Sequence, residues 1–190
     1  MTTDNFGYLE IIIGPMFSGK TTYLVNLYKQ YNAEKKSVVA INYVDDKRYH
    51  DKMLSTHDLV TIPCIFTKNI GDVLNDNSNE HNAILSADVV LINEGQFFPD
   101  LFETVSTMVE KYGKIVHICG LDGDFKRQRF GSLLDLIPLC DKIVKLSANC
   151  NVCKNPALFS HRMTTETSQI VIGSDNYVPL CRSCYIAETK

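Results

Sequence analysis

The sequence predicts an α/β fold, in which a mostly parallel sheet with helices on its faces is followed by a small metal-held C-terminal unit. Three observations support this. Apolar runs alternate with segments of helical periodicity. A glycine-rich turn separates the first run from the first helix, and two Cys-x₂-Cys pairs lie in the last 40-odd residues. A chain of 190 residues suits one core plus an appendage. We place the boundary near Ser147, giving units 1–147 and 148–190.

The first half of the core contains two predicted strands and one helix. The β-branched run 8–13 stops at Gly14-Pro15, as a buried strand does before a turn. Apolar residues then recur at helical spacing from Gly19 to about Ala33, and 38–42 predicts a second buried strand. Residues 45–61 are polar and irregular, which predicts a long functional loop. The Asn-rich stretch 71–81 is predicted to be a solvated connector.

The second half repeats the alternation. Residues 89–92 predict a strand that ends at Asn93-Glu94, and Pro99 opens a helix to about Tyr112 with one apolar stripe. That stripe is expected to be core or subunit interface. A strand at 115–119, a charged loop at 120–129 and a strand at 143–146 complete the core. Strands separated by helices and loops in this way imply βαβ units.

Composition and charge exclude several classes. The chain is 45% apolar and 22% charged, which argues against disorder. Its 19 basic and 22 acidic residues give a net charge of −3, so broad nucleic-acid binding is not expected. No apolar run reaches the length of a membrane span, and the N-terminus lacks the pattern of a secretory signal. We therefore expect no membrane partner, a cytoplasmic location, and cysteines used for metal instead of disulfides.

The turn from Gly14 to Thr21 fits the phosphate-loop (P-loop) pattern GxxxxGK[ST] and has the required strand before it and helix after it. In such a loop successive backbone N–H groups surround a polyphosphate, and the helix points its positive end at the same anion. Lys20 adds a full positive charge, and the Thr21 hydroxyl can bind Mg²⁺. The sequence therefore predicts a P-loop core that binds a nucleoside triphosphate.

The end of the strand at 89–92 carries the second nucleotide-binding signal. Asn93 stands where an aspartate is expected to hold the metal, and a neutral amide brings no charge. Glu94 is then the anionic group at this strand end. It could simply be a loop or helix-capping acid. We favour a role in accepting a proton from the phosphoryl acceptor, because the carboxyl ends of strands in open α/β sheets face the ligand crevice.

The four paired cysteines predict a structural zinc site. Two-residue spacing lets both thiolates of a pair reach one tetrahedral ion, and two pairs close the shell without an open position. We expect that removing the metal would unfold the appendage, because about 40 residues build too small a core. The ligands are Cys150, Cys153, Cys181 and Cys184, whereas Cys64, Cys119 and Cys140 are interpreted as buried apolar fillers.

Zinc ribbons often bind nucleic acid, which is a competing interpretation of this unit. Between the two cysteine pairs the possible cations are Lys154, His161 and Arg162, opposed by acidic residues. A loop that closes on a small ligand fits better, with Gly173 allowing close backbone approach and Tyr177 offering an aromatic face.

Several motifs together resemble one known family, the type II thymidine kinases of cellular, bacterial and poxviral type. The residues that carry the resemblance run in order over most of the chain, from about residue 8 to residue 185. They are Gly14–Thr21, Asp46–Tyr49, Glu94–Asp100, Leu121–Phe125 and the four-cysteine knuckle.

This resemblance implies transfer of the ATP γ-phosphoryl group to the 5′-hydroxyl of thymidine, and of deoxyuridine, giving dTMP in deoxynucleotide salvage. It implies Mg²⁺ for catalysis, structural Zn²⁺, a homotetramer, and feedback inhibition by thymidine triphosphate. It also implies a zinc-anchored "lasso" from Gln169 to Gly173 that closes over the base and grips it through main-chain atoms.

The resemblance further implies roles for individual residues. Glu94 is the general base, with Lys20 and Arg48 completing the catalytic set. Within the pocket, Phe125 stacks on the pyrimidine and Ser160 lies near its C5 substituent. The implied ATP and Mg²⁺ contacts are Gly14, Pro15, Met16, Phe17, Ser18, Gly19, Lys20, Thr21, Asp46, Lys47, Arg48, Asn93 and Gln96. The implied nucleoside contacts are Met16, Phe97, Leu121, Phe125, Ser160, Gln169, Ile170, Val171, Ile172, Gly173 and Tyr177.

Two other functions stay open at this point. A kinase acting on a nucleoside monophosphate would need an arginine-rich lid, for which 126–129 is the candidate segment. A nucleotide-switched module would instead use ATP hydrolysis to move the zinc unit onto nucleic acid.

Overall fold

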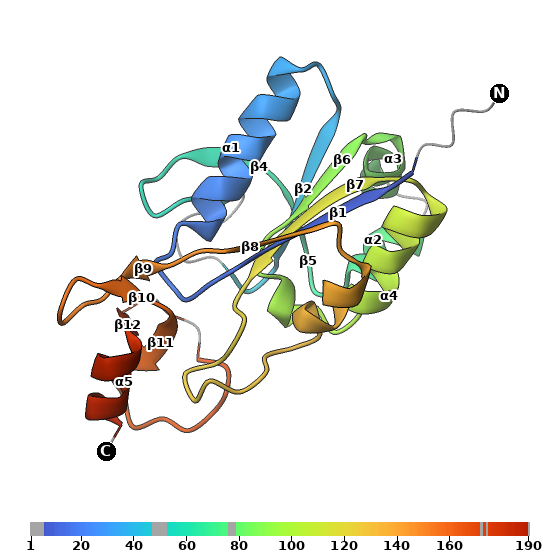
Figure 1. Cartoon of the computed structure of the whole chain (residues 1–190). Helices are drawn as coiled ribbons and strands as arrows, with labels where there is room; N and C mark the ends of the chain where they lie inside the picture. The colour runs from blue at the N-terminus through green and yellow to red at the C-terminus, as the bar shows by residue number, and fades with distance from the viewer. Residues whose placement is uncertain (1–5, 47–52, 76–78, 172, 174, 190) are drawn as a thin grey trace.

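The computed structural model describes residues 6–46, 53–75, 79–171, 173 and 175–189. Its centre is a six-stranded sheet in which every pairing is parallel (Figure 1). In spatial order the strands are β5 (Ile65–Thr67), β2 (Val38–Tyr43), β6 (Val89–Ile92), β7 (Ile115–Gly120), β1 (Tyr8–Ile13) and β8 (Lys142–Lys145). The predicted α/β class is therefore confirmed.

The central strands are buried on both faces, which explains their nearly continuous apolar sequences. All four residues of β6 are completely buried, and Ile11 and Ile12 of β1 point to opposite faces with no exposed area. The predicted strands at 8–13, 38–42, 89–92, 115–119 and 143–146 correspond to β1, β2, β6, β7 and β8 within one residue at either end.

Helices cover both faces of the sheet. Helix α1 (Lys20–Ala33) packs on one face together with β3 (Met53–Ser55) and β4 (Thr61–Pro63), in a core cluster that includes Leu24, Leu54 and Ile62. The other face carries α2 (Ile70–Asn75), α3 (Asn79–Ser86), α4 (Leu101–Ser106) with the π turn η2 (Thr107–Lys111), and the 3₁₀ segments η1 (Gly95–Phe97) and η3 (Leu133–Leu139). Figure 1 shows α1 separated from α2 and α4 by the sheet. No helix within the described ranges has both the length and the apolar character needed to cross a membrane.

Two sequence predictions were wrong. The stretch 71–81 is not a connector: α2 and α3 occupy most of it, because Ile70, Val73 and Ile84 bury against the sheet. The abundance of polar residues hid this apolar spacing. Residues 45–61 are not wholly irregular either, since β3 pairs antiparallel with β4 and buries Leu54 opposite Ile62.

The C-terminal part is built from short elements around a very small core. They are β9 (Ala148–Asn149), β10 (Pro156–Ala157), β11 (Phe159–Arg162), β12 (Tyr177–Leu180) and α5 (Arg182–Glu188). The apolar cluster at its centre is made of Ala148, Cys150, Ala157, Leu180 and Tyr185.

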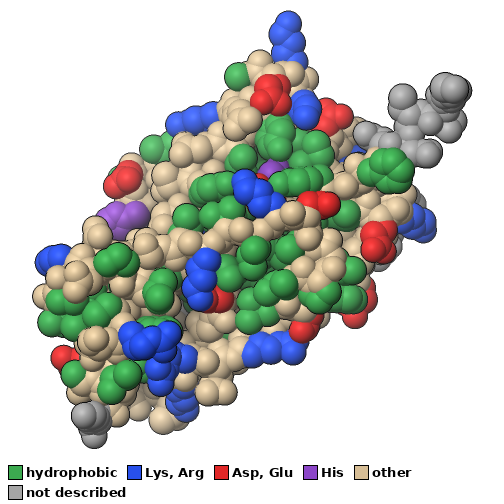
Figure 2. All heavy atoms as spheres, in the orientation of Figure 1, with side chains coloured by type: hydrophobic (Ala, Val, Ile, Leu, Met, Phe, Trp, Pro, Cys, Tyr) green, Lys and Arg blue, Asp and Glu red, His purple; other side chains and the backbone are tan. Residues whose placement is uncertain are grey.

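Apolar side chains also remain on the surface near the edge strand β8. Ile143 of β8 is 45% exposed, and Ile137 and Leu139 of η3 are each 39% exposed. Figure 2 shows apolar side chains gathered on this face of the molecule. Within the predicted apolar stripe, Leu101, Val105 and Met108 are buried core, whereas Phe102 is partly exposed.

Candidate active site

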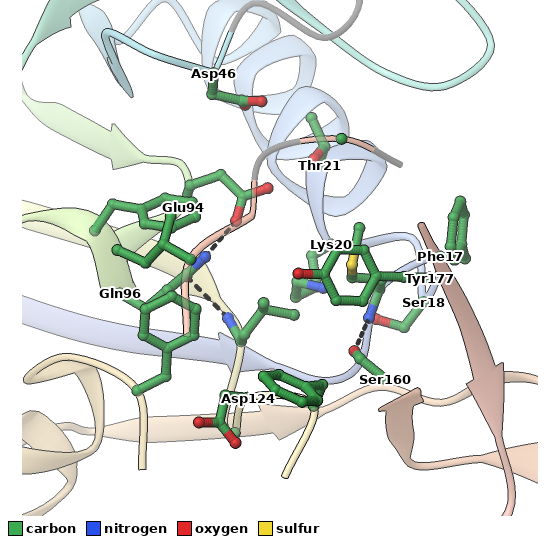
Figure 3. A pocket seen from close by; sticks show the side chains of 18 of the residues that line it. Phe17, Ser18, Lys20, Thr21, Asp46, Glu94, Gln96, Asp124, Ser160 and Tyr177 are labelled. Atoms are coloured by element: carbon green, nitrogen blue, oxygen red, sulfur yellow. Dashed lines mark hydrogen bonds between the residues drawn. The ribbon is translucent and has the colours of Figure 1, made fainter. Parts of the chain in front are cut away.

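A cavity lies where the carboxyl ends of the strands meet the C-terminal unit, at the edge where open α/β sheets bind ligands. It brings together residues from segments that are far apart in the chain (Figure 3). Of the predicted site residues, those that line it are Met16, Phe17, Ser18, Gly19, Lys20, Thr21, Asp46, Glu94, Gln96, Phe97, Leu121, Phe125, Ser160, Gln169, Ile170, Val171, Gly173 and Tyr177. Lys47, Arg48 and Ile172 lie outside the described residues.

The phosphate loop is shaped by backbone conformations that favour glycine. Gly14 has a φ of 153° and Gly19 a φ of 81°, and a Cβ on Gly14 would lie 2.6 Å from the Leu146 carbonyl oxygen. The Lys20 ammonium donates to the Pro15 carbonyl at 2.7 Å, and the side chain is only 8% exposed. The positive charge is therefore held inside the loop, where a polyphosphate would sit.

Asn93 stands at the centre of a buried hydrogen-bond network. Its Oδ1 accepts from the Thr21 hydroxyl at 3.3 Å and from the Cys119 thiol at 3.0 Å. Its Nδ2 donates to Asn42 Oδ1 at 2.9 Å, and Asn42 Nδ2 lies 3.3 Å from the Asp46 carbonyl and 3.5 Å from its carboxylate. Burial raises the pKa of the Cys119 thiol to about 12, so it stays a neutral donor. Cys119 is therefore buried but is more than an apolar filler.

Glu94 is held in an unusual backbone conformation just after β6. Its φ of 55° lies in the left-handed region, which non-glycine residues seldom adopt. Its Oε2 accepts from Gln96 Nε2 at 2.6 Å, and Gln96 Oε1 in turn accepts from the Leu121 backbone N–H at 2.9 Å (Figure 3). Both side chains are buried. The two polar ends of Gln96 thus hold the carboxylate of Glu94 in the cavity.

Gly120, the last residue of β7, leaves room for the Gln96 side chain. A Cβ on Gly120 would lie 2.4 Å from Gln96 Oε1, so a larger residue would displace the amide that holds Glu94. Sequence reasoning treated Gln96 as a nucleotide contact and did not anticipate its link to Glu94.

Aromatic and polar contacts form the other walls. The Phe97 ring stacks on Tyr43 at 5.2 Å and meets Phe130 edge-on at 5.4 Å. The Met16 backbone N–H donates to Ser160 Oγ at 2.9 Å, which joins the phosphate loop to β11. The C-terminal unit is thereby attached directly to the turn that would hold the donor.

The segment predicted to be a lasso crosses the cavity without regular secondary structure in its described residues. Gln169 Nε2 donates to Asp124 Oδ2 at 2.9 Å and to the Arg129 carbonyl at 3.2 Å. The Tyr177 hydroxyl donates to the Val171 carbonyl at 3.2 Å. These contacts tie the segment to the 120–129 loop and to β12.

Arg162 is a residue of this region that sequence reasoning missed. The sequence indicates only a possible cation for nucleic acid at this position, but Arg162 is 4% exposed and its guanidinium carbon lies 3.7 Å from the centre of the Phe125 ring. The signal was available: Ser160 and Arg162 alternate on one face of a strand, and Ser160 was already a site candidate.

The four predicted metal ligands come together. The sulfurs of Cys150, Cys153, Cys181 and Cys184 all lie within 4.8 Å of one another, and those of Cys153 and Cys181 are 3.6 Å apart. Tetrahedral zinc with bonds of about 2.3 Å requires sulfurs roughly 3.8 Å apart, so the cluster fits this ion.

Hydrogen bonds within the cluster lower the pKa of two of its thiols, those of Cys150 and Cys181, and raise that of Cys184 to about 12. Desolvation raises the pKa of the Cys150 thiol, but backbone N–H groups of Cys153, Cys181 and Val152 outweigh it and lower the pKa to about 6. A thiolate is therefore favoured at a ligand position.

Comparison with known proteins agrees with these motifs. The model of a family described as "Thymidine kinase" matches residues 7–185. The thymidine kinase of variola virus is 43% identical over 183 residues, covering 96% of this chain and 98% of that protein. That of Yaba monkey tumor virus is 42% identical over 180 residues, with 94% of each chain covered. That of vaccinia virus (strain Western Reserve) is 41% identical over 183 residues, covering 96% and 98%.

Proposed function

The chain belongs to the thymidine kinase family, and from this premise we propose that it transfers the γ-phosphoryl group of ATP to the 5′-hydroxyl of thymidine, and of deoxyuridine, giving the 5′-monophosphate. One observation carries the proposal. The carboxylate of Glu94, held by Gln96, lines the same cavity as residues 16–21 of the phosphate loop and the described residues of the segment from Gln169 to Gly173. The proposed donor site, the proposed base and the proposed nucleoside pocket therefore lie in one cavity.

At the donor end, the backbone amides of the phosphate loop and the Lys20 ammonium bind the triphosphate. The Thr21 hydroxyl and the Asp46 carboxylate are oxygen ligands of the kind Mg²⁺ prefers, and both line the cavity. When bound, the ion neutralises charge on the phosphates. Arg48 and Lys47 are proposed to add positive charge there.

At the acceptor end, Glu94 accepts the proton of the 5′-hydroxyl as that oxygen bonds to the γ-phosphorus. The bond from the γ-phosphorus to the bridging oxygen breaks, and ADP leaves. Such transfers need alignment and charge neutralisation more than covalent help, which is why a positioned carboxylate and nearby cations suffice.

The pyrimidine lies between aromatic side chains and the lasso. Phe125 offers a stacking face, Met16 and Phe97 form walls, and main-chain groups of 169–173 meet the polar edge of the base. We also propose that Tyr177 contacts the deoxyribose, Ser160 the C5 region and Leu121 the nucleoside. Apart from Ile172, which lies outside the described residues, these residues line the cavity, which supports the assignment.

We further propose that zinc occupies the four-cysteine cluster, and that residues 148–190 act as a unit distinct from 1–147. The apolar cluster of the C-terminal part draws only on residues from 148 onward, which supports this division. A homotetramer, feedback by thymidine triphosphate and a cytoplasmic location are proposed from family membership. The exposed apolar side chains around β8 supply surface suited to subunit packing.

The proposal is tested by measuring ADP release with and without thymidine. Acceleration by thymidine, and none by DNA or RNA, is the expected result. Acceleration by nucleic acid instead would favour the nucleotide-switched module, and acceleration only by a nucleoside monophosphate would favour the other kinase.

Replacing Asn93 with aspartate is expected to lower the Mg²⁺ concentration needed for ATP binding by about fivefold, because it adds a charge beside Thr21. The same change should lower the melting temperature of the free protein, since the Asn93 amide that donates to Asn42 is lost. Binding of a fluorescent ATP analogue at varied Mg²⁺ measures the first effect. Asn82→Asp, the same change at an exposed residue of α3, is the matched control and should leave the Mg²⁺ requirement as in the wild type. An unchanged Mg²⁺ requirement in Asn93→Asp would contradict the prediction.

A further inference from the structure

Arg162 is a buried cation whose acceptors are all neutral in the part of the chain that the structure describes. It lies on β11 and is 4% exposed. Its guanidinium donates to the carbonyls of Glu166, Ser168 and Gln169 and to the Tyr177 hydroxyl. A buried charge is costly unless its donors are satisfied, and here several oxygens meet the fixed fork of one guanidinium. Such a site is built for arginine.

These acceptors lie on both sides of the cavity-lining segment. The carbonyls of 166, 168 and 169 lead into it, and the Tyr177 hydroxyl, where β12 begins, also donates to the Val171 carbonyl at 3.2 Å. One side chain therefore fixes where the segment starts and, through Tyr177, where it passes Val171. Main-chain groups that hydrogen-bond to a base must be held in one orientation, and the hydrogen bonds from Arg162 hold them there.

The same guanidinium also covers Phe125. Its central carbon lies 3.7 Å from the ring centre, which is a stacking contact, so a ligand ring can stack only on a face that Arg162 leaves open. Phe125 and the lasso thus share one support, and their separation, which sets the width of the base pocket, depends on it.

We propose that Arg162 is a positioning residue that sets nucleoside affinity and the preference for a pyrimidine, acting through Phe125 and the lasso carbonyls. This inference rests on the proposed function. Lysine cannot replace it, because an ammonium has three donors around one point and no planar face for stacking.

The test compares Arg162→Lys with Arg127→Lys. Arg127 is exposed and lies over the ring of Tyr185 at 4.5 Å, so this control makes the same chemical change at an arginine–aromatic contact that does not line the cavity. For each variant the KM for thymidine, the KM for ATP, turnover of deoxyguanosine and zinc per chain are measured.

Arg162→Lys is expected to raise the KM for thymidine about 10- to 100-fold. It should also lower the ratio of thymidine turnover to deoxyguanosine turnover. The KM for ATP should stay within about twofold, with zinc bound as in the wild type, and Arg127→Lys should change neither KM. Tyr177→Phe, which removes the bridging hydroxyl, should raise the KM for thymidine by a smaller factor.

An unchanged KM for thymidine in Arg162→Lys would overturn the assignment. So would loss of zinc with equal weakening for both substrates, because that pattern belongs to a purely structural residue. Wild-type turnover of thymidine is measured first. Its absence would overturn the proposed function and this inference with it, whereas an active wild type makes the variant a test of Arg162 alone.

Discussion

Replacing Glu94 with glutamine is expected to lower kcat for thymidine phosphorylation by about 10²- to 10⁴-fold, the range associated with general-base catalysis. Glutamine has almost the same shape and its amide oxygen can still accept from Gln96, but it cannot take the proton of the 5′-hydroxyl. Steady-state kinetics measure the loss. Binding of an ATP analogue should stay near the wild-type level, because the phosphate loop is untouched.

The matched control is Glu103→Gln, the same chemical change at an exposed residue of α4. It should leave kcat within about twofold of the wild type. If Glu94→Gln turned over thymidine as fast as this control, Glu94 would not be the base.

Removing zinc is expected to abolish thymidine binding while leaving ATP binding largely intact. The apolar core of the C-terminal unit contains only a handful of residues, and structural zinc in small domains contributes about 10–16 kcal/mol to folding. Without it, β11 and β12 lose their support, and the segment that crosses the cavity is released. Cys150→Ser should have the same effect, since its sulfur is fully buried among the other three. Limited proteolysis reports whether the C-terminal unit is still folded. Calorimetric titration measures the binding of thymidine and of ATP separately.

Cys140→Ser serves as the control, because this thiol is only partly buried and lies outside the cluster. It should retain both zinc and thymidine binding. Thymidine binding that survived complete removal of zinc would contradict the role given to the C-terminal unit.

The core strands and the phosphate loop were predictable because their signals are local. A buried parallel strand is an apolar run, and a phosphate loop is a fixed spacing of glycine, lysine and threonine between a strand and a helix. The four cysteines could be assigned to one metal site from their spacing alone, and their sulfurs do come together.

The parts that escaped prediction depend on contacts between distant segments. Helices α2 and α3 were hidden by polar residues, and only the sheet shows which side of each is buried. Gln96 can hold Glu94 because the backbone N–H of Leu121, at the end of the neighbouring strand β7, fixes the other end of its amide. The alternation with Ser160 could have indicated that Arg162 is buried, but the backbone carbonyls that it binds are known only from the folded chain.

The most direct test follows the terminal phosphate itself. Purified protein, loaded with zinc and Mg²⁺, is given thymidine and ATP labelled in the γ-phosphoryl group, and the products are separated. The account predicts label on the 5′-oxygen of thymidine and unlabelled ADP in equal amounts. Label released only as inorganic phosphate, with thymidine unchanged, would contradict it.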